Sequence, residues 1–193
     1  MAEVAGTLVT SLLQRVRDPQ GAAHSRDVAR SILDYCQQII NAFTGQVYET
    51  VTISAGARQQ IHNLRTLAPN YVHIQDAKQE GRSLSRTDTR ALFYYSRDWA
   101  RDVGPRREAF AELGLDIAIF YPATAEAVSL DVTSTKITAP LVDEDVATEL
   151  PDEVMAAALS MAEAILQLRQ RNLADAATAM QTMTTAAAQF SRG

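Results

Sequence analysis

The sequence of 193 residues predicts an α+β fold, in which an N-terminal helix pair and long C-terminal helices form a helical bundle and a small antiparallel β-sheet is inserted in the middle. Two observations predict this fold. Apolar residues recur at helical spacing near both ends of the chain, whereas β-branched residues alternate with polar ones between these ends. We therefore expect a helical domain made of residues 1–45 and 150–193, a β-rich middle region over 46–139, and an acidic linker over 140–149.

The N-terminal helix pair is predicted from two apolar stripes separated by a turn. The first stripe spans residues 5–17 and ends at the turn-forming sequence Asp-Pro-Gln-Gly of residues 18–21. Ser25 is a suitable N-cap for the second helix, and Gly45 is typical of the position just after a helix C-terminus. One face of the second helix carries Val28, Ile32, Cys36, Ile39, Ile40 and Phe43.

Strand signals dominate the middle of the chain. Residues 47–53 alternate β-branched and polar side chains with a period of two, which is typical of a half-buried strand. A mixed, charged segment over residues 85–102 predicts a helix that contains the only tryptophan, Trp99. Further strands are expected over residues 71–78, 82–84, 117–121 and 127–133, with a turn at Glu80-Gly81.

The C-terminal third predicts two helices. Pro151 is expected at the first helical position, where its missing N–H costs nothing, and the acids that follow it suit the positive end of the helix dipole. The last helix begins after Asn172, and Asp175 is the only charged residue between Asn172 and residue 190. This low charge favours a partner surface; a helix whose Thr and Gln residues simply face water is the alternative. The candidate interface residues of this helix are Leu173, Met180, Met183 and Phe190.

The charge of the chain is unevenly distributed. The net charge is −5, and residues 143–153 hold six acids and no Lys or Arg. A protein that grips nucleic acid through its phosphates shows a basic excess instead, so tight sequence-independent DNA binding is not expected. A second charged cluster surrounds Trp99. It indicates either a docking surface for an acidic partner or a solvated surface held by salt bridges, and its candidate interface residues are Arg97, Arg101 and Arg106.

The sequence contains no recognisable catalytic or metal-binding pattern. His24, His62 and His73 lie in different segments, and Cys36 falls on an apolar helix stripe, as a small core residue does. Phosphate-loop, paired-cysteine and dinucleotide-binding motifs are missing from the sequence. We therefore predict no enzymatic activity, no cofactor and no metal. No apolar run approaches the ~20 residues of a membrane span, so no membrane association is expected.

The order of these segments, taken as a whole, resembles the head-to-tail adaptor (connector or upper tail-tube) proteins of tailed bacteriophages, above all the short-tailed ones. The resemblance covers nearly the whole chain, and each motif is weak by itself. The segments that carry it are residues 12–19, 25–27, 120–122, 128–132, 150–153 and 169–173, together with the region of Trp99.

This resemblance implies a structural virion protein, located at the head–tail junction and assembled in the host cytoplasm. Its partners would be a portal protein on one side, a tail nozzle or tube protein on the other, and identical subunits in a homo-oligomeric ring of twelve. DNA would pass through the lumen as cargo during ejection, and Asp143, Glu144 and Asp145 would face that channel. The alternative is a helical-bundle binding or regulatory module with a small-molecule pocket.

Overall fold

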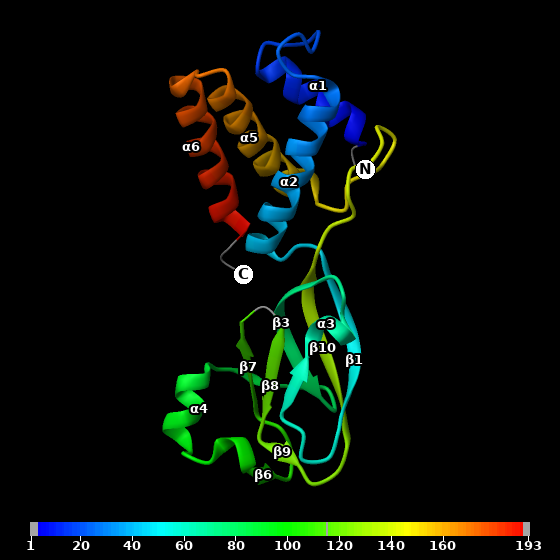
Figure 1. Cartoon of the computed structure of the whole chain (residues 1–193), viewed down its shortest axis with the longest axis vertical. Coiled ribbons are helices and arrows are strands. Elements are labelled where there is room, and N and C mark those ends of the chain that lie inside the picture. Colours follow the sequence, from blue (N-terminus) through cyan, green and yellow to red (C-terminus); the bar gives the residue numbers. More distant parts are fainter. Residues whose placement is uncertain (1–3, 115, 191–193) are drawn as a thin grey trace. The chain divides into compact units, whose positions relative to one another are not determined.

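A computed structural model describes residues 4–114 and 116–190 of the chain (Figure 1). The chain divides into two compact units. The first, called the helical unit here, comprises Met1–Val47 and Ile137–Gly193, and the second, the β unit, comprises Tyr48–Lys136. The acidic stretch over residues 140–149 groups with the helical unit.

The helical unit begins with the predicted helix pair, α1 (Ala5–Arg15) and α2 (Arg26–Thr44). Both ends of α2 are as expected. The hydroxyl of Ser25 accepts the N–H of Val28 at 3.3 Å, and Gly45 closes the helix with a φ of 64°, a conformation that glycine adopts at little cost. The apolar stripe of α1 is buried in the core of this unit.

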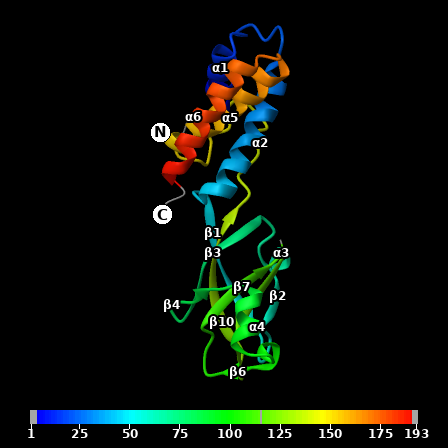
Figure 2. The same cartoon turned by 90° about the vertical axis from the view of Figure 1, so that its left-hand side faces the viewer.

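Helix α5 (Asp152–Arg169) occupies the centre of the helical unit and contacts α1, α2 and α6 (Leu173–Phe190). Its buried face contains many small residues, such as Ala157, Ala158 and Ala162, which let the neighbouring helices approach closely. Figure 2 shows α6 lying along α5. Pro151 occupies the N-cap and not the first helical position, so the helix begins one residue later than predicted.

Two four-stranded sheets form most of the β unit. The first has the order β1-β10-β3-β4 and is antiparallel throughout; its strands are Tyr48–Ala55, Val128–Lys136, Tyr71–Gln79 and Arg82–Ser83. The second has the order β2-β8-β7-β5; its strands are Ile61–Asn63, Ile117–Tyr121, Ala109–Leu113 and Ser85–Arg86. Within it β5 and β7 run parallel, as do β6 (Val103–Gly104) and β9 (Ala123–Thr124) in a separate two-stranded pair.

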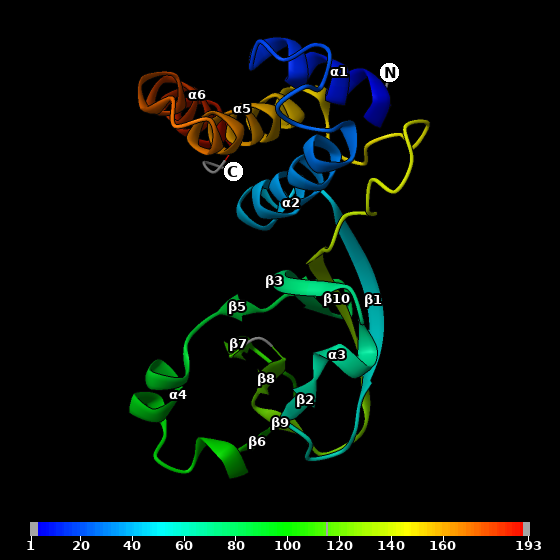
Figure 3. The same ribbon diagram turned by 45° about the horizontal axis from the view of Figure 1, so that its top comes forward.

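The two four-stranded sheets share one apolar core. Ile74 and Leu130 from the first sheet lie in the same buried cluster as Phe110 and Phe120 from the second. Short helices complete the unit: α3 (Leu64–Leu67), α4 (Thr89–Tyr95) and a 3₁₀ turn at Trp99–Arg101. Figure 3 shows α4 projecting at one side of the β unit, between β5 and β6.

The predicted fold of a helical bundle with a small inserted sheet is wrong. The chain is α+β, but Tyr48–Lys136, nearly half of it, forms a separate unit with its own core, and the described residues of this unit make ten strands in three sheets. Several of these strands are two residues long, which is too short to show any periodicity in the sequence. The expected helix over 85–102 is likewise reduced to α4 and the 3₁₀ turn.

Candidate functional site

Helix α6 presents part of its predicted apolar stripe to solvent. Leu173 is 70% exposed and Met180 is 40% exposed, whereas Met183 packs partly against the core of the helical unit. The face toward the core is made chiefly by Ala176 and Ala179. Phe190 ends the helix, and its side chain is outside the described residues. The predicted stripe is therefore divided between the monomer core and the surface.

The three candidate channel-facing acids are exposed, but they are not equivalent. The carboxylate of Glu144 accepts the Nε–H of Arg26 at 2.6 Å, and this hydrogen bond holds the pKa of Glu144 below its usual range. The carbonyl of Glu144 also accepts the N–H of Gly6 at 2.8 Å. In the described part of the chain, Asp143 and Asp145 form no ion pair. Of the three candidate acids, Asp143 and Asp145 thus carry a charge that no ion pair of the described residues compensates.

The predicted basic cluster lies on the surface of the β unit. Arg97, Arg101 and Arg106 are all exposed, and among the residues described none of them takes part in an ion pair. Of the two acids between them, Asp98 and Asp102, the carboxylate of Asp102 accepts the hydroxyl of Tyr121 at 2.8 Å. The described structure therefore shows these arginines as solvated and without salt bridges, and whether they dock an acidic partner stays a prediction.

An exposed aromatic triplet on α4 was missed by the sequence analysis. Leu92 is buried, but the next three side chains are not: Phe93 is 56% exposed, Tyr94 84% and Tyr95 80%. Successive positions on a helix point about 100° apart, so a short helix that buries Leu92 cannot also bury all three of its neighbours. Adjacent exposed aromatic residues are typical of a protein–protein contact surface.

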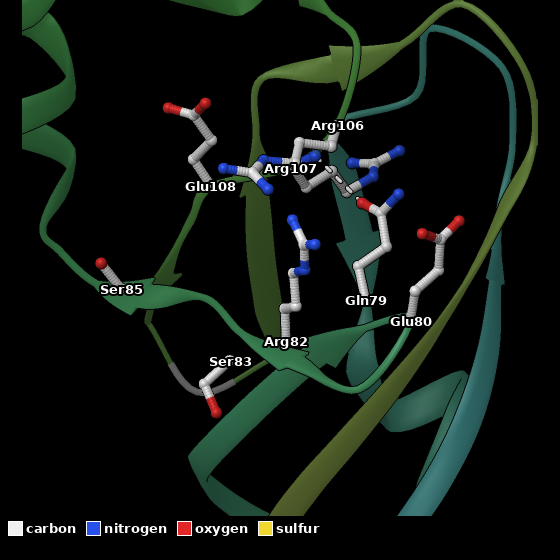
Figure 4. A pocket seen from close by; sticks show the side chains of 8 residues that line it. All are labelled: Gln79, Glu80, Arg82, Ser83, Ser85, Arg106, Arg107 and Glu108. Carbon is white, nitrogen blue, oxygen red and sulfur yellow. Dashed lines mark hydrogen bonds between the residues drawn. The ribbon is translucent and has the colours of Figure 1, made fainter.

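A polar pocket of about 370 Å³ lies in the β unit beside the β3–β4 hairpin (Figure 4). Its walls come from the hairpin, from β5 and from the segment that leads into β7. Three arginines contribute to it, and only Arg106 was among the residues predicted from the sequence to lie at an interface. The lining residues are Gln79, Glu80, Arg82, Ser83, Ser85, Arg106, Arg107 and Glu108.

Arg107 is the buried member of this pocket, with only 3% of its surface exposed. Its guanidinium donates to the carbonyl of Phe120 at 2.8 Å and to the carbonyl of Gln59 at 2.7 Å. Burial lowers the pKa of this guanidinium from its ordinary value. No carboxylate in the described structure pairs with it, so a positive charge is held inside the β unit.

The histidines and the cysteine lie apart, in packed surroundings. Cys36 is fully buried in the helical unit, and burial raises the pKa of its thiol to about 12. His62 packs edge-on against Phe120, and His73 lies within 3.2 Å of the hydroxyl of Thr135. Within residues 4–114 and 116–190, no group of three or more His, Cys, Asp or Glu side chains is placed to hold a metal ion.

A groove of about 340 Å³ in the helical unit bears on the predicted small-molecule alternative. It is lined by residues of α1, α5 and α6, among them Arg15, Glu163, Gln167 and Asp175. Sites for small organic ligands are mostly apolar, with a few polar groups that orient the ligand. The charged lining of this groove differs from that pattern.

Neither a protein-family model nor a curated protein sequence matches the chain. Among the helices of the described residues, none is long and apolar enough to cross a membrane.

Proposed function

We propose that this chain is a structural subunit that assembles through helix α6, as a head-to-tail adaptor of a short-tailed phage. Identical subunits would form a ring, of twelve members in the family that the sequence resembles, between a portal protein and a tail nozzle or tube. The protein would act by docking and by enclosing a channel, without catalysis.

The observation that carries this proposal is the composition of the exposed face of α6. Asp175 is the one charged residue in this helix of 18 residues, and Leu173 and Met180 remain accessible to water. Burying a fully exposed Leu or Met side chain contributes about 1.5–3 kcal/mol, so covering the exposed 70% of Leu173 and 40% of Met180 would contribute about 1–2 and about 0.6–1.2 kcal/mol. A ring brings one face of each subunit against a different face of its neighbour, so α6 would need a separate acceptor surface.

The acidic residues supply the second part of the proposal. Asp143 and Asp145 would face the channel, where their repeated negative charge around a ring repels phosphates and keeps passing DNA from adhering. Glu144 contributes less to this field, because its charge is paired with Arg26. Arg97, Arg101 and Arg106 would contact an acidic surface of the portal, of the tail protein or of the next subunit.

The test is assembly of a double variant, Leu173→Gln with Met180→Gln. The matched control is Leu168→Gln, which alters a leucine that is 50% exposed on α5. Each protein is co-expressed with the portal protein of the same genome and assessed by sedimentation velocity and negative-stain electron microscopy. We expect the unchanged protein and the control to form rings on portals, and the double variant to remain unassembled with the same unfolding midpoint.

Portals fully decorated by the double variant would refute the role of α6. A protein that stays a monomer or dimer at all concentrations, with or without portal, would instead support the alternative of a regulatory module. Unfolding of the double variant would show that the two side chains belong to the monomer core. Their exposed fractions argue against that outcome.

A further inference from the structure

Of the residues that line the arginine pocket of the β unit, the assembly proposed above uses only Arg106, and the construction of the pocket is specific. Glu80 and Gly81 form the turn between β3 and β4, with φ values of 52° and 76°. Two successive residues with positive φ are typical of the tight type I′ hairpin. This turn places Arg82 directly opposite Gln79 in the ladder.

Gln79 then joins the hairpin to the other wall of the pocket. Its side-chain oxygen accepts the backbone N–H of Arg107 at 2.9 Å, and Gln79 is itself 93% buried. This bond fixes the backbone of Arg106 and Arg107 next to the hairpin. In Figure 4 the side chain of Arg82 extends toward these two residues. Three guanidinium-bearing residues from two distant chain segments thus line one hollow.

The charge of this hollow is incompletely neutralised. The side chain of Arg107 is bonded only to neutral carbonyls, and its buried Nε has no hydrogen-bond partner among the described atoms. Arg82 and Arg106 are exposed and take part in no ion pair of the described residues. Burying an unpaired charge is costly, and an anion held nearby offsets part of that cost.

Two carboxylates at the rim limit what can enter. Glu80 and Glu108 also line the pocket, and in Figure 4 they stand at opposite sides of the view. Neither forms an ion pair with an arginine in the described structure. They would repel an extended polyanion such as duplex DNA, which needs many basic contacts. A single compact anion between the guanidinium groups avoids most of this repulsion.

We propose that the pocket binds one phosphate group, as free phosphate or as the phosphate of a small monoester. The guanidinium groups of Arg82 and Arg106 donate to its oxygens, a geometry that suits the planar, multi-donor arginine side chain. Arg107 is buried in the wall of the pocket and attracts the phosphate as a fixed positive charge. The volume of about 370 Å³ lies at the small end of the range for ligand sites, which favours a compact ligand.

The experiment is a titration of the full chain with inorganic phosphate by isothermal titration calorimetry, at low ionic strength and neutral pH. Titrations with sodium chloride, adenosine monophosphate and pyrophosphate are run in parallel. We expect saturable binding of phosphate and none of chloride. Tighter binding of the nucleotide would identify a monoester as the better ligand, and equal binding would identify free phosphate. Both results support the site.

Substitutions at the exposed arginines locate the binding. Arg82→Gln and Arg106→Gln should each weaken it about tenfold or more, because a hydrogen bond to a charged group contributes about 1.5–3 kcal/mol. The matched control, Arg90→Gln, removes an exposed arginine of α4 that does not line the pocket and should leave the affinity unchanged. Glu80→Gln should strengthen binding by removing a repulsive charge.

Absence of saturable phosphate binding would overturn the proposal. Equal weakening by Arg90→Gln would also overturn it, because it would show a general response to net charge. Circular dichroism verifies that each variant is folded, and both arginines are exposed, so loss of the fold is not expected. Ring assembly is tested with different substitutions, Leu173→Gln and Met180→Gln on α6, so failure of the phosphate site and failure of the assembly proposal are distinguishable.

Discussion

Glu112 connects the two four-stranded sheets of the β unit. Replacing it by Leu or by Gln should lower the free energy of unfolding by different amounts, which tests how much its hydrogen bonds stabilise the unit. It lies on β7, and one of its oxygens accepts the backbone N–H of Ile74 at 2.9 Å and the hydroxyl of Tyr71, both on β3. The other oxygen accepts Arg86 Nη2 at 2.9 Å. Burial and the nearby carboxylate raise the pKa of Tyr71, so its hydroxyl keeps the proton that it donates.

The Glu112→Leu variant keeps similar bulk but removes every acceptor. Ile74 is fully buried and Tyr71 is 5% exposed, so their N–H and O–H groups would lose their partners inside the core. An unsatisfied buried donor costs about 1–3 kcal/mol. The ion pair with Arg86 adds only about 0–1 kcal/mol, because the Arg86 side chain is 62% exposed. With two donors left unsatisfied, we expect a total loss of about 2–7 kcal/mol in the free energy of unfolding.

Two further variants separate the buried hydrogen bonds from the exposed ion pair. Glu112→Gln retains one acceptor oxygen and should lose only about 1–2 kcal/mol. Arg86→Leu removes the ion pair alone and should lose under about 1 kcal/mol. The assay is urea unfolding followed by the fluorescence of Trp99, the only tryptophan, which lies in the β unit. A loss below about 1 kcal/mol for Glu112→Leu, or an equal loss for Arg86→Leu, would refute this reasoning.

Two other predictions concern buried titratable groups. Burial raises the pKa of the Cys36 thiol to about 12, so Cys36 should resist alkylation by iodoacetamide in the folded protein near pH 8 and react in urea, as mass spectrometry would show. The Cys36→Ala variant should lower the free energy of unfolding by about 1 kcal/mol or more. Burial and the charge of Arg107 lower the pKa of His62, so the unfolded state binds more protons and the β unit should lose stability as pH falls below about 6.5. Urea midpoints from Trp99 fluorescence at several pH values check this, and the dependence should flatten in His62→Gln.

The helices could be predicted because their signals are long and local. The stripes of α1, α2 and α5 extend over several turns, and the ends of α2 are specified by Ser25 and Gly45 within a residue or two. The β unit lacks such signals. Strands β4, β5, β6 and β9 have two residues each, and they exist because distant segments supply hydrogen-bond partners. The number of strands therefore could not be predicted from the periodicity of apolar residues in the sequence.

The arginine pocket was hidden for a related reason. In the sequence, Arg106 and Arg107 look alike, as neighbouring arginines of the charged segment that follows Trp99. The structure separates them, because Arg107 reaches the carbonyls of Phe120 and Gln59, which are distant in the chain. Its partner wall comes from the hairpin at Gln79, nearly thirty residues earlier. The exposed aromatic triplet of α4, in contrast, could have been predicted from the sequence, because three consecutive aromatic residues cannot all lie on the buried face of one helix.

In the acidic segment, the number of acids in the sequence overstates the negative electrostatic potential that the folded segment presents. The sequence treats Asp143, Glu144 and Asp145 as equal members of one negative stretch. In the structure, Arg26 neutralises Glu144, whose carbonyl is also bonded to the N–H of Gly6 at the start of α1. The segment is therefore held against the helical unit at its middle residue, with Asp143 and Asp145 exposed on either side of it. A repulsive channel built from this segment would carry two uncompensated charges per subunit here, and it would keep a fixed position because Glu144 serves as the anchor.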